Sequence, residues 1–241
     1  MASLAGALRR LLRRPSRKPA VHPFDTRHGV DTAGLLYARA LASGHAHHRY
    51  NEGYYGTAPS LFRGLMALWQ STLAAGCGLS GYSFIDLGCG KGRVLMLASE
   101  FPFRSIAGIE LDANLTRTAR RNLKKWLRSP RACRHLAVEH ADVLALELPP
   151  GPVLLYLFNA FHAEVLAALL NRLAAAARSR SAPIDLLYVH PDHDALVRRT
   201  PEIEFLADAE IPFSPEDAAA DVFGVCSDRC IVYRLRGDLA R

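Results

Sequence analysis

A turn with three glycines at alternate positions, preceded by an acid, constrains the fold of this chain more than any other feature. It reads FIDLGCGKGRVLMLAS and spans residues 84–99. The apolar residues before Asp86 predict a buried strand, and the residues after Gly92 predict a helix. Because glycine has no Cβ, Gly88, Gly90 and Gly92 leave one side of a tight strand-to-helix turn as bare backbone, which a ligand can approach closely.

A dinucleotide-binding turn has a different pattern. It would read G-x-G-x-x-G and hold a pyrophosphate on the helix N-terminus. This chain reads D-x-G-x-G-x-G, with Arg93 in the place of the third dinucleotide glycine. The carboxylate of Asp86 at the strand end would repel a pyrophosphate, but it suits a cationic amino-acid ligand. The sequence therefore disfavours a nicotinamide-dependent dehydrogenase.

Two more acids follow at the ends of the next two predicted strands. Glu110 ends the apolar run of residues 105–111 and lies 24 positions after Asp86 (110 − 86 = 24). A carboxylate at the tip of the second strand can accept hydrogen bonds from both ribose hydroxyls, as the acid of dinucleotide folds does. Asp142 closes a third run, LAVEHADV. Ordinary turn composition would explain the glycines but not both acids.

This combination of a glycine turn and two acids at successive strand ends resembles the motifs of the class I S-adenosylmethionine-dependent methyltransferases. The resemblance implies an α/β fold, namely a single-domain, Rossmann-like methyltransferase fold with a mostly parallel sheet and an antiparallel C-terminal strand. It also implies S-adenosyl-L-methionine as the cofactor, with Asp142 on the adenine amino group. The cofactor-binding residues implied at these strand ends are Asp86, Gly88, Gly90, Gly92, Glu110 and Asp142.

The end of the fourth predicted strand indicates the class of methyl acceptor. The strand VLLYLF is apolar throughout, as a central parallel strand should be, and Asn159-Ala160-Phe161 follows it. This segment resembles the non-SET histone lysine methyltransferases, their bacterial relatives and the mitochondrial lysine methyltransferases that modify an ATP-synthase subunit. The upstream segment GYYGTAPSLFRGLM loosely matches the Tyr-Thr-Pro-type segment of these groups. The resemblance covers roughly residues 50–178 by motif position, and Ala160 departs from the pattern.

The residues after this strand are the candidates for chemistry, because ligands of open α/β sheets bind beyond the carboxyl ends of the strands. Methyl transfer from a sulfonium is an in-line displacement, so positioning supplies much of its rate. The carbonyl of Asn159 is expected to accept a hydrogen bond from the attacking amine and so to orient its lone pair. We predict Asn159 and Phe161 as catalytic residues, and Asn159 also as a cofactor contact. Capping of a helix over residues 163–178 is the alternative role of Asn159.

Aromatic and hydroxyl side chains upstream complete the predicted site. Tyr54 and Tyr55 are expected to favour the cationic sulfonium and the product ammonium through cation–π contact, and core packing or a lid is the alternative. Tyr55 and Thr57 are predicted to bind the cofactor, Thr57 at the methionine moiety. His190, at the tip of the fifth predicted strand, is a further candidate for substrate contact or proton removal.

The positive charge of the chain is concentrated at its N-terminus. The net charge is +7, and residues 1–20 hold six bases and no acid, which leaves 24 bases and 23 acids in the rest. We therefore predict no specific nucleic-acid interface on the fold. The first 20 residues are expected to form a flexible tail that makes at most weak contact with anionic surfaces. An organellar transit peptide is the alternative.

Removal of this tail is expected to leave the fold and its cofactor binding intact. A protein that begins at His22 should bind cofactor as the full chain does and should lose any salt-sensitive adhesion to anionic vesicles or nucleic acid. Calorimetry and vesicle sedimentation measure the two properties. Loss of cofactor binding in the shortened protein would instead make the tail part of the fold.

The cysteines and histidines predict no metal site. The chain has five cysteines, an odd number with no C-x-x-C pair, which fits reduced thiols and a cytoplasmic location. Cys226 and Cys230 are predicted to be small buried side chains, and His45, His47 and His48 are expected to be solvated. No apolar run approaches the roughly 18 residues that a membrane span needs. If the tail is a transit peptide, an organelle replaces the cytoplasm.

Three regions are predicted along the chain. They are the basic tail at residues 1–20, an N-terminal helical segment at residues 21–80 that covers the cofactor site, and the methyltransferase core at residues 81–241. The second region is expected to include a helix near residues 32–43. The predicted function is methyl transfer to a nucleophilic nitrogen, a protein lysine amine. The alternatives are a small-molecule N- or O-methyltransferase with the same cofactor site and a catalytically silent scaffold that binds the cofactor.

Overall fold

The computed structural model describes residues 21–37, 47, 52–128 and 130–237, so the basic tail lies outside the described residues. The strands of the main sheet are β3 (Ser83–Leu87), β4 (Ser105–Glu110), β5 (Leu136–His140), β6 (Val153–Phe158), β7 (Ile184–Val189), β8 (Ile203–Pro212) and β9 (Ser227–Leu235). The α-helices are α2 (Pro23–His28), α3 (Pro59–Ser71), α4 (Arg93–Ala98), α5 (Ala113–Trp126), α6 (Ala163–Arg178), α7 (Asp194–Val197) and α8 (Pro215–Ala220). The shorter elements are β1 (Leu35–Leu36), β2 (Tyr54–Tyr55), η3 (Leu79–Gly81) and η4 (Val143–Ala145).

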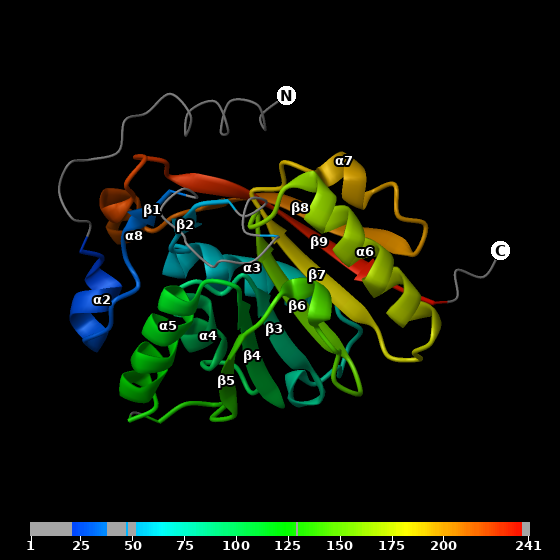
Figure 1. The fold of residues 1–241 in the computed structure, drawn as a ribbon, viewed down its shortest axis with the longest axis horizontal. Helices are drawn as coiled ribbons and strands as arrows, with labels where there is room; N and C mark the ends of the chain where they lie inside the picture. Colours follow the sequence, from blue (N-terminus) through cyan, green and yellow to red (C-terminus); the bar gives the residue numbers. More distant parts are fainter. Residues whose placement is uncertain (1–20, 38–46, 48–51, 129, 238–241) are drawn as a thin grey trace.

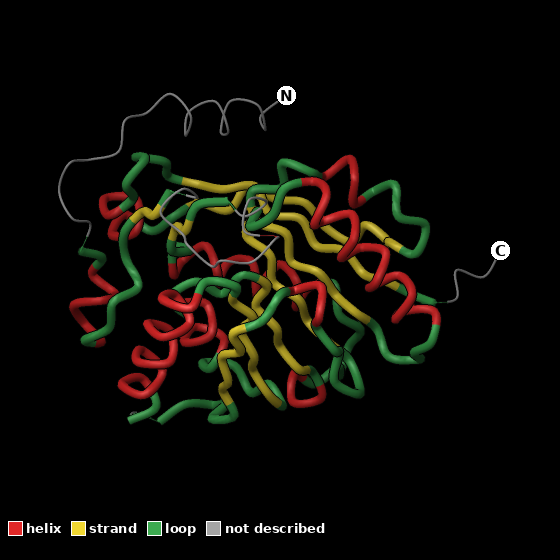
Figure 2. Tube along the Cα trace, in the orientation of Figure 1, coloured by secondary structure: helices red, strands yellow, loops and turns green. Residues whose placement is uncertain are grey.

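The main sheet has seven strands in the order β5-β4-β3-β6-β7-β9-β8. The five strands β3, β4, β5, β6 and β7 run parallel to one another, and β9 is antiparallel to both of its neighbours, β7 and β8. Figures 1 and 2 show this twisted sheet crossing the molecule, with helices on both faces. The structure confirms the predicted α/β Rossmann-like sheet, including its antiparallel C-terminal strands.

Each face of the sheet has its own hydrophobic core, because successive strand residues point to opposite faces. Phe84 of β3 belongs to the core under α3, α4 and α5, whereas Ile85 belongs to the core under α6 and α7. Strand β6 is buried on both faces from Val153 to Leu157, as its unbroken apolar sequence predicts. The central strands β3, β6 and β7 are therefore covered on both faces.

The strand order reverses beside β3. The chain runs outward from β3 to β4 and β5, and then returns to β6 on the other side of β3. Ligands of such sheets bind at this reversal, outside the carboxyl ends of the strands. Asp86 lies near the end of β3, Glu110 ends β4, and Asn159 directly follows β6. The topology thus brings the predicted site residues to one edge of the sheet.

The helix predicted near residues 32–43 is wrong for the part of that range that the structure describes. Gly34 has a φ of +101°, which a helix does not allow. Leu35 and Leu36 instead pair antiparallel with Tyr55 and Tyr54, so β1 and β2 form a two-stranded ribbon. Residues 38–43 lie outside the described residues. The long-range pairing with β2 decides this segment, and local helical spacing cannot reveal it.

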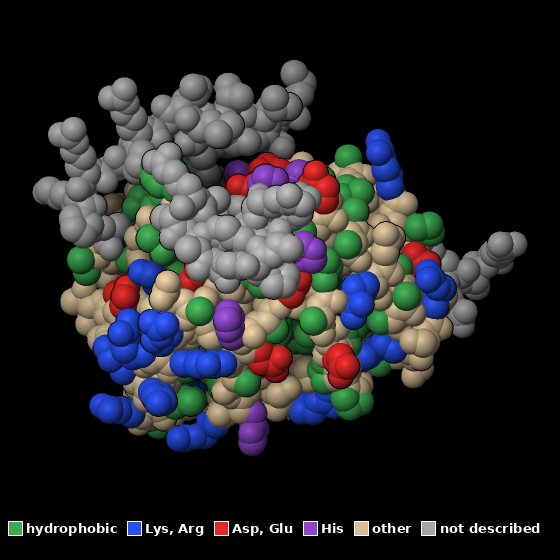
Figure 3. All heavy atoms as spheres, viewed as in Figure 1, with side chains coloured by type: hydrophobic (Ala, Val, Ile, Leu, Met, Phe, Trp, Pro, Cys, Tyr) green, Lys and Arg blue, Asp and Glu red, His purple; other side chains and the backbone are tan. Residues whose placement is uncertain are grey.

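The bases of the fold are not spread evenly over its surface. Figure 3 shows Lys and Arg side chains gathered where Figure 1 places α5. The residues of this basic face are Arg117, Arg120, Arg121, Lys124 and Lys125, all exposed. The near balance of 24 bases and 23 acids outside the tail therefore hides a local concentration of positive charge on one helix.

The two cysteines that were predicted to be buried meet different outcomes. Cys230 is buried as predicted, but Cys226 is exposed, because β9 begins only at Ser227 and leaves Cys226 outside the sheet.

In the described part of the chain, no group of three or more His, Cys, Asp or Glu side chains is placed to hold a metal ion. Among the helices that the structure describes, none combines the length and the apolar character that crossing a membrane requires.

The start of α5 depends on one capping side chain. The carboxylate of Asp112 accepts the backbone N–H groups of Asn114 at 2.8 Å and Leu115 at 2.9 Å. Asp112→Ala leaves both donors without a partner and is expected to lower the free energy of unfolding by about 1 kcal/mol. Urea unfolding measures the change. Asp112→Ser keeps a capping oxygen and serves as the control, and equal stability losses in the two variants would contradict the capping role.

Candidate functional site

A pocket lies at the carboxyl ends of β3, β4 and β6, under the segment of residues 52–57. Its empty volume is about 890 Å³, with solvent at the open mouth included. Of the predicted residues, this pocket brings together Tyr54, Tyr55, Thr57, Asp86, Gly88, Gly90, Glu110, Asp142 and Phe161. Gly92, Asn159 and His190 are not in its lining.

The glycine turn is fastened to the end of β4. Gly88, Gly90 and Gly92 all have positive φ values, of 82°, 54° and 84°. The N–H groups of Gly88 and Cys89 both donate to the carbonyl oxygen of Ile109 at 3.0 Å. Gly92 serves packing, since a Cβ there would lie 3.2 Å from the Cβ of Ala119 on α5. Gly88 and Gly90 are therefore the two glycines that present backbone to the pocket.

One side of the turn at Gly90 is already occupied. A Cβ on Gly90 would lie 2.3 Å from a ring carbon of Tyr54, so the ring covers this glycine directly. The Tyr54 hydroxyl donates to the carbonyl oxygen of Thr32 at 2.6 Å, which holds the ring in place. The sequence predicted that a ligand fills the space beside Gly90. That space belongs to Tyr54, which is a wall of the pocket.

The carboxylates of Asp86 and Glu110 are both buried in the pocket wall, but their partners differ. Glu110 accepts the N–H groups of Gly90 and Asp112, each at 2.8 Å. Burial raises the pKa of Glu110, and these hydrogen bonds oppose the rise. Asp86 is 3% exposed, and within the described residues its carboxylate accepts no hydrogen bond. Burial, together with the nearby Glu110, raises the pKa of Asp86 well above its usual value.

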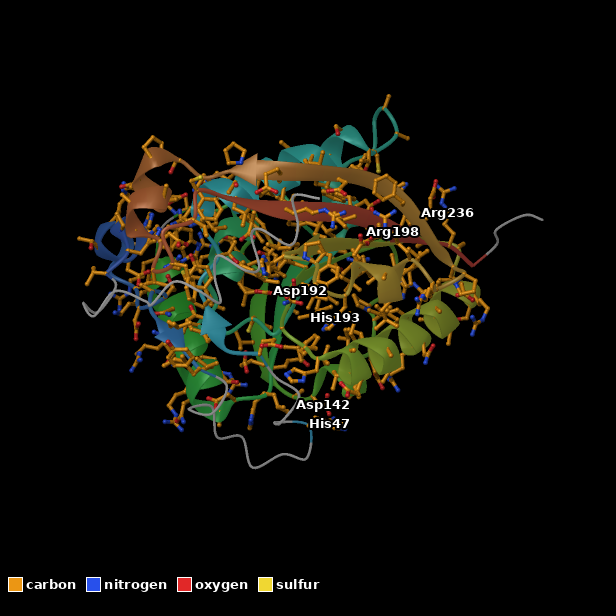
Figure 4. The ribbon with its side chains drawn as sticks, turned by 90° about the horizontal axis from the view of Figure 1, so that it is seen from above. His47, Asp142, Asp192, His193, Arg198 and Arg236 are labelled. Carbon is orange, nitrogen blue, oxygen red and sulfur yellow. The ribbon has the colours of Figure 1, made fainter. Side chains whose placement is uncertain are left out.

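Asp142 lies at the end of the pocket next to η4 and contacts a histidine. One carboxylate oxygen accepts the N–H of Leu144 at 2.9 Å, and the other lies 2.6 Å from Nδ1 of His47. Figure 4 shows the His47 and Asp142 side chains side by side. His47 was predicted to be solvated, but it lines the pocket. The cluster of histidines in the sequence gave no indication of which member would meet Asp142.

Hydroxyl and aromatic groups of the segment before α3 form the roof of the site. The hydroxyl of Thr57 lies 2.9 Å from the hydroxyl of Tyr156, and both residues are buried. The Tyr55 hydroxyl donates to the carboxylate of Asp221, and its ring packs edge-on against Phe158 at a centroid distance of 6.0 Å. These contacts join the roof to β6 and to the segment before β9.

The strand ends beyond the pocket hold two residues in an uncommon backbone conformation. Asn159 has a φ of 35° and His190 a φ of 50°, and non-glycine residues with positive φ cluster at functional sites. The Asn159 amide donates to Asp192 at 2.8 Å, and its oxygen accepts from Tyr188 at 3.2 Å. Nδ1 of His190 lies 2.9 Å from Oδ1 of Asp228. Figure 4 marks Asp192 in this region.

The alternative role of Asn159 as a helix cap is wrong. Helix α6 has its N-cap at His162, three positions further on, and no side chain caps it. Phe161 is buried, lines the pocket and faces Gly88, where a Cβ would lie 3.8 Å from its ring. Of the two predicted catalytic residues, Phe161 lines the pocket and Asn159 stands beyond its edge.

Sequence reasoning missed a buried arginine that joins the N-terminal segment to the glycine turn. Arg93 is 4% exposed, and its Nε donates to the Thr32 hydroxyl at 2.7 Å. Its Nη1 donates to the carbonyl oxygen of Thr57 at 3.1 Å. Nearby, Lys91 Nζ lies 2.8 Å from an Asp31 carboxylate oxygen. The signal for it in the sequence is an arginine at a position where dinucleotide-binding turns have glycine.

Comparison with known proteins finds similar folds among solved structures. No family model and no curated protein sequence matches this chain. Magnesium protoporphyrin IX methyltransferase (ChlM) from Synechocystis PCC 6803, solved with bound SAM, is 13% identical, with a TM-score of 0.50 over 73% of this chain and 79% of that chain. The N-methyltransferase NodS from Bradyrhizobium japonicum WM9 is 10% identical, with a TM-score of 0.49 over 73% of this chain and 94% of that one.

A third similar structure, the [4+2]-cyclase SpnF, is 12% identical, with a TM-score of 0.49 over 73% of this chain and 81% of that one. The likeness to ChlM shows that this chain has the Rossmann-like fold of S-adenosylmethionine-dependent methyltransferases. Such a fold does not fix the reaction, so function has to be argued from the residues of the site.

Proposed function

We propose that this protein binds S-adenosylmethionine in the pocket beside the glycine turn and transfers its methyl group to a nucleophilic nitrogen. The observation that carries the proposal is the Asp86 carboxylate, which is buried at the turn without a hydrogen-bond partner among the described residues. A buried carboxylate is stable as an anion only beside a cation or several donors. The α-ammonium group of an amino-acid ligand supplies both.

The other acids of the pocket fit the rest of the same ligand. Each carboxylate oxygen of Glu110 receives one N–H and keeps a second lone pair, which ribose hydroxyls can use. Asp142 offers an acceptor for an adenine amino group at the other end of the pocket. A dinucleotide would bring its pyrophosphate to Asp86 and Glu110, and this arrangement of acids repels it. The pocket chemistry therefore favours adenosine linked to an amino acid.

When bound, S-adenosylmethionine supplies an electrophilic methyl group on a sulfonium, and the protein has to exclude water and orient the acceptor. Phe161, Phe158 and Tyr55 provide apolar and aromatic walls for this purpose. Glu52 also lines the pocket and adds an anionic group to it. Both features attract an ammonium ion. We therefore favour an amine as the acceptor, and a protein lysine amine on the resemblance to the non-SET lysine methyltransferases.

The test is transfer of tritiated methyl groups from S-adenosylmethionine to a cell lysate, with products separated by size. The full chain is expected to label protein, with methyl-lysine after hydrolysis. The Asp86→Asn variant is the matched control and should label nothing above background. Label confined to small molecules would replace the lysine acceptor by a small-molecule acceptor. Binding of the cofactor without any transfer would indicate a silent cofactor-binding scaffold.

The Asn159 side chain is expected to direct the acceptor. Asn159→Gly removes the amide and accommodates the φ of 35° without strain. Turnover should fall by about tenfold to a hundredfold while cofactor affinity changes less than a few-fold, as expected for an interaction made mainly in the transition state. Steady-state kinetics and calorimetry measure the two quantities, with thermal melts as the control for folding. Normal turnover in a folded variant would shift the acceptor site toward His190.

A further inference from the structure

Arg93 carries a buried positive charge that its protein neighbours do not fully pair. Its Nε and Nη1 donate to the Thr32 hydroxyl at 2.7 Å and to the Thr57 carbonyl at 3.1 Å. The third nitrogen, Nη2, is buried and has no hydrogen-bond partner among the described residues. A carboxylate oxygen of Asp25 lies 3.6 Å from it, which is an ion pair but not a hydrogen bond. A buried donor left without an acceptor is costly.

Asp25 cannot satisfy this nitrogen without giving up closer partners. One of its oxygens accepts the N–H groups of Thr32 and Ala33, both at 2.7 Å, and the other accepts the Thr32 hydroxyl. These donors order the loop after α2. The ion pair with Arg93 therefore remains long, and the guanidinium keeps the capacity to bind a second carboxylate.

The position of Arg93 points to a ligand rather than to packing alone. Arg93 lines the pocket beside the glycine turn and also a smaller cavity behind Tyr55 and Gly56. Among the described residues that line the pocket beside the glycine turn, Arg93 is the only Lys or Arg, whereas four are Asp or Glu. It follows the glycine turn directly, and it holds the carbonyl of Thr57, a residue predicted to meet the methionine moiety.

We infer that Arg93 binds the α-carboxylate of the amino-acid part of the ligand, while Asp86 receives its α-ammonium group. This inference rests on the proposed function. A guanidinium and a carboxylate form charge-assisted hydrogen bonds that are stronger than neutral ones. Among the described Lys and Arg residues, Arg93 is thus the one with which the pocket can select a complete amino acid over a simple amine.

The experiment compares S-adenosylmethionine with decarboxylated S-adenosylmethionine, which has the same adenosine, sulfonium and amine but no carboxylate. Calorimetry on the full chain measures both affinities for the wild type and for Arg93→Gln. The wild type is expected to bind S-adenosylmethionine about tenfold to a hundredfold more tightly than the decarboxylated ligand. In Arg93→Gln the ratio should approach one, through weaker binding of S-adenosylmethionine alone.

Lys91→Gln is the matched control. Lys91 is a cation two positions away, it binds Asp31 and the Ala33 carbonyl of the same N-terminal segment, and it does not line the pocket. Its loss should leave the affinity ratio at the wild-type value. Should Arg93→Gln not fold, Arg93→Lys replaces it, and the ratio is expected to fall several-fold because lysine lacks the planar fork.

Two results would overturn the inference while leaving the proposed function intact. One is a wild-type protein that binds both ligands with equal affinity. The other is an Arg93 variant that loses affinity for both ligands by the same factor, since a residue that only fastens the N-terminal segment would act in this way. A wild type that binds neither ligand would contradict the proposed function and this inference with it.

Discussion

Replacement of Asp86 by Asn is expected to weaken S-adenosylmethionine binding by on the order of a thousandfold and to raise the thermal stability of the ligand-free protein. The variant keeps the size of the side chain and removes its charge. Binding falls because the amide no longer attracts the α-ammonium group. Stability rises because the free protein no longer buries a carboxylate that has no hydrogen-bond partner among the described residues. A substitution that lowers the affinity for the ligand and raises the stability of the free protein indicates a charge that is kept for binding.

The pH dependence of stability provides a second readout for the same variant. Burial raises the pKa of Asp86 above the ordinary value of 3.8. The folded protein therefore holds this proton after the unfolded chain has released it, so stability falls as pH rises from that value through the raised pKa. Asp86→Asn should show a smaller fall than the wild type. Glu110, whose pKa is also raised, remains in both proteins.

Thermal melts across this pH range, with calorimetry at neutral pH, measure both effects. A variant that melts below the wild type at neutral pH and binds the ligand as tightly would contradict the role of Asp86. Asp112→Asn is the control, because it removes a nearby buried carboxylate that already accepts two N–H groups. It should not gain stability.

Gly90→Val is expected to abolish detectable binding of S-adenosylmethionine and to destabilise the protein by about 3 kcal/mol or more. Two causes add. A β-branched residue is strained at the φ of +54°, and its Cβ would lie 2.3 Å from the ring of Tyr54. Tyr54 must move, and it carries with it the roof of the pocket. Calorimetry and urea unfolding measure the two losses.

Gly76 offers a matched control for the strain. Its φ is +81°, and a Cβ there would meet nothing within 4 Å. Gly76→Val should therefore show the cost of the backbone alone, about 1–2 kcal/mol, with unchanged binding. The combination of Gly90→Val with Tyr54→Ala should regain part of the stability. Equal destabilisation at Gly76 and Gly90, with binding intact in both, would refute the contact between Tyr54 and the turn.

Local pattern was sufficient to predict the sheet and the acids of the pocket. The run VLLYLF has no charged residue and is hydrophobic throughout, and β6 is buried on both faces from Val153 to Leu157 as a result. Asp86 and Glu110 each follow an apolar run, and a parallel sheet places such residues at one edge whatever the details of packing. These predictions needed only the period of the strands and their direction.

Contacts between distant segments could not be predicted in this way. Arg93 and Thr32 are 61 positions apart, and nothing in either neighbourhood indicates that they meet. The contact between Tyr54 and Gly90 could not be predicted for the same reason. Tyr54 belongs to the ribbon of β1 and β2, and the pairing of these two segments places its ring over Gly90. The helix predicted near residues 32–43 failed for this reason also.

The backbone conformation at the strand ends could not be predicted from the sequence either. Positive φ values at glycine are expected, but those of Asn159 and His190 depend on the side chains that hold them. Asn159 is held by Tyr188, which belongs to the neighbouring strand β7, and by Asp192, which follows that strand. The sequence was therefore sufficient to single out Asn159 as a candidate, but it could not predict the orientation of its side chain.

Calorimetric titration of the full chain with S-adenosylhomocysteine and, separately, with NAD tests the central claim most directly. The arrangement of Asp86, Glu110 and Asp142 around the glycine turn predicts saturable binding of one S-adenosylhomocysteine per chain and no heat of binding with NAD. Binding of NAD, or the absence of any binding by S-adenosylhomocysteine to the folded protein, would contradict the assignment of this pocket to an adenosyl amino acid.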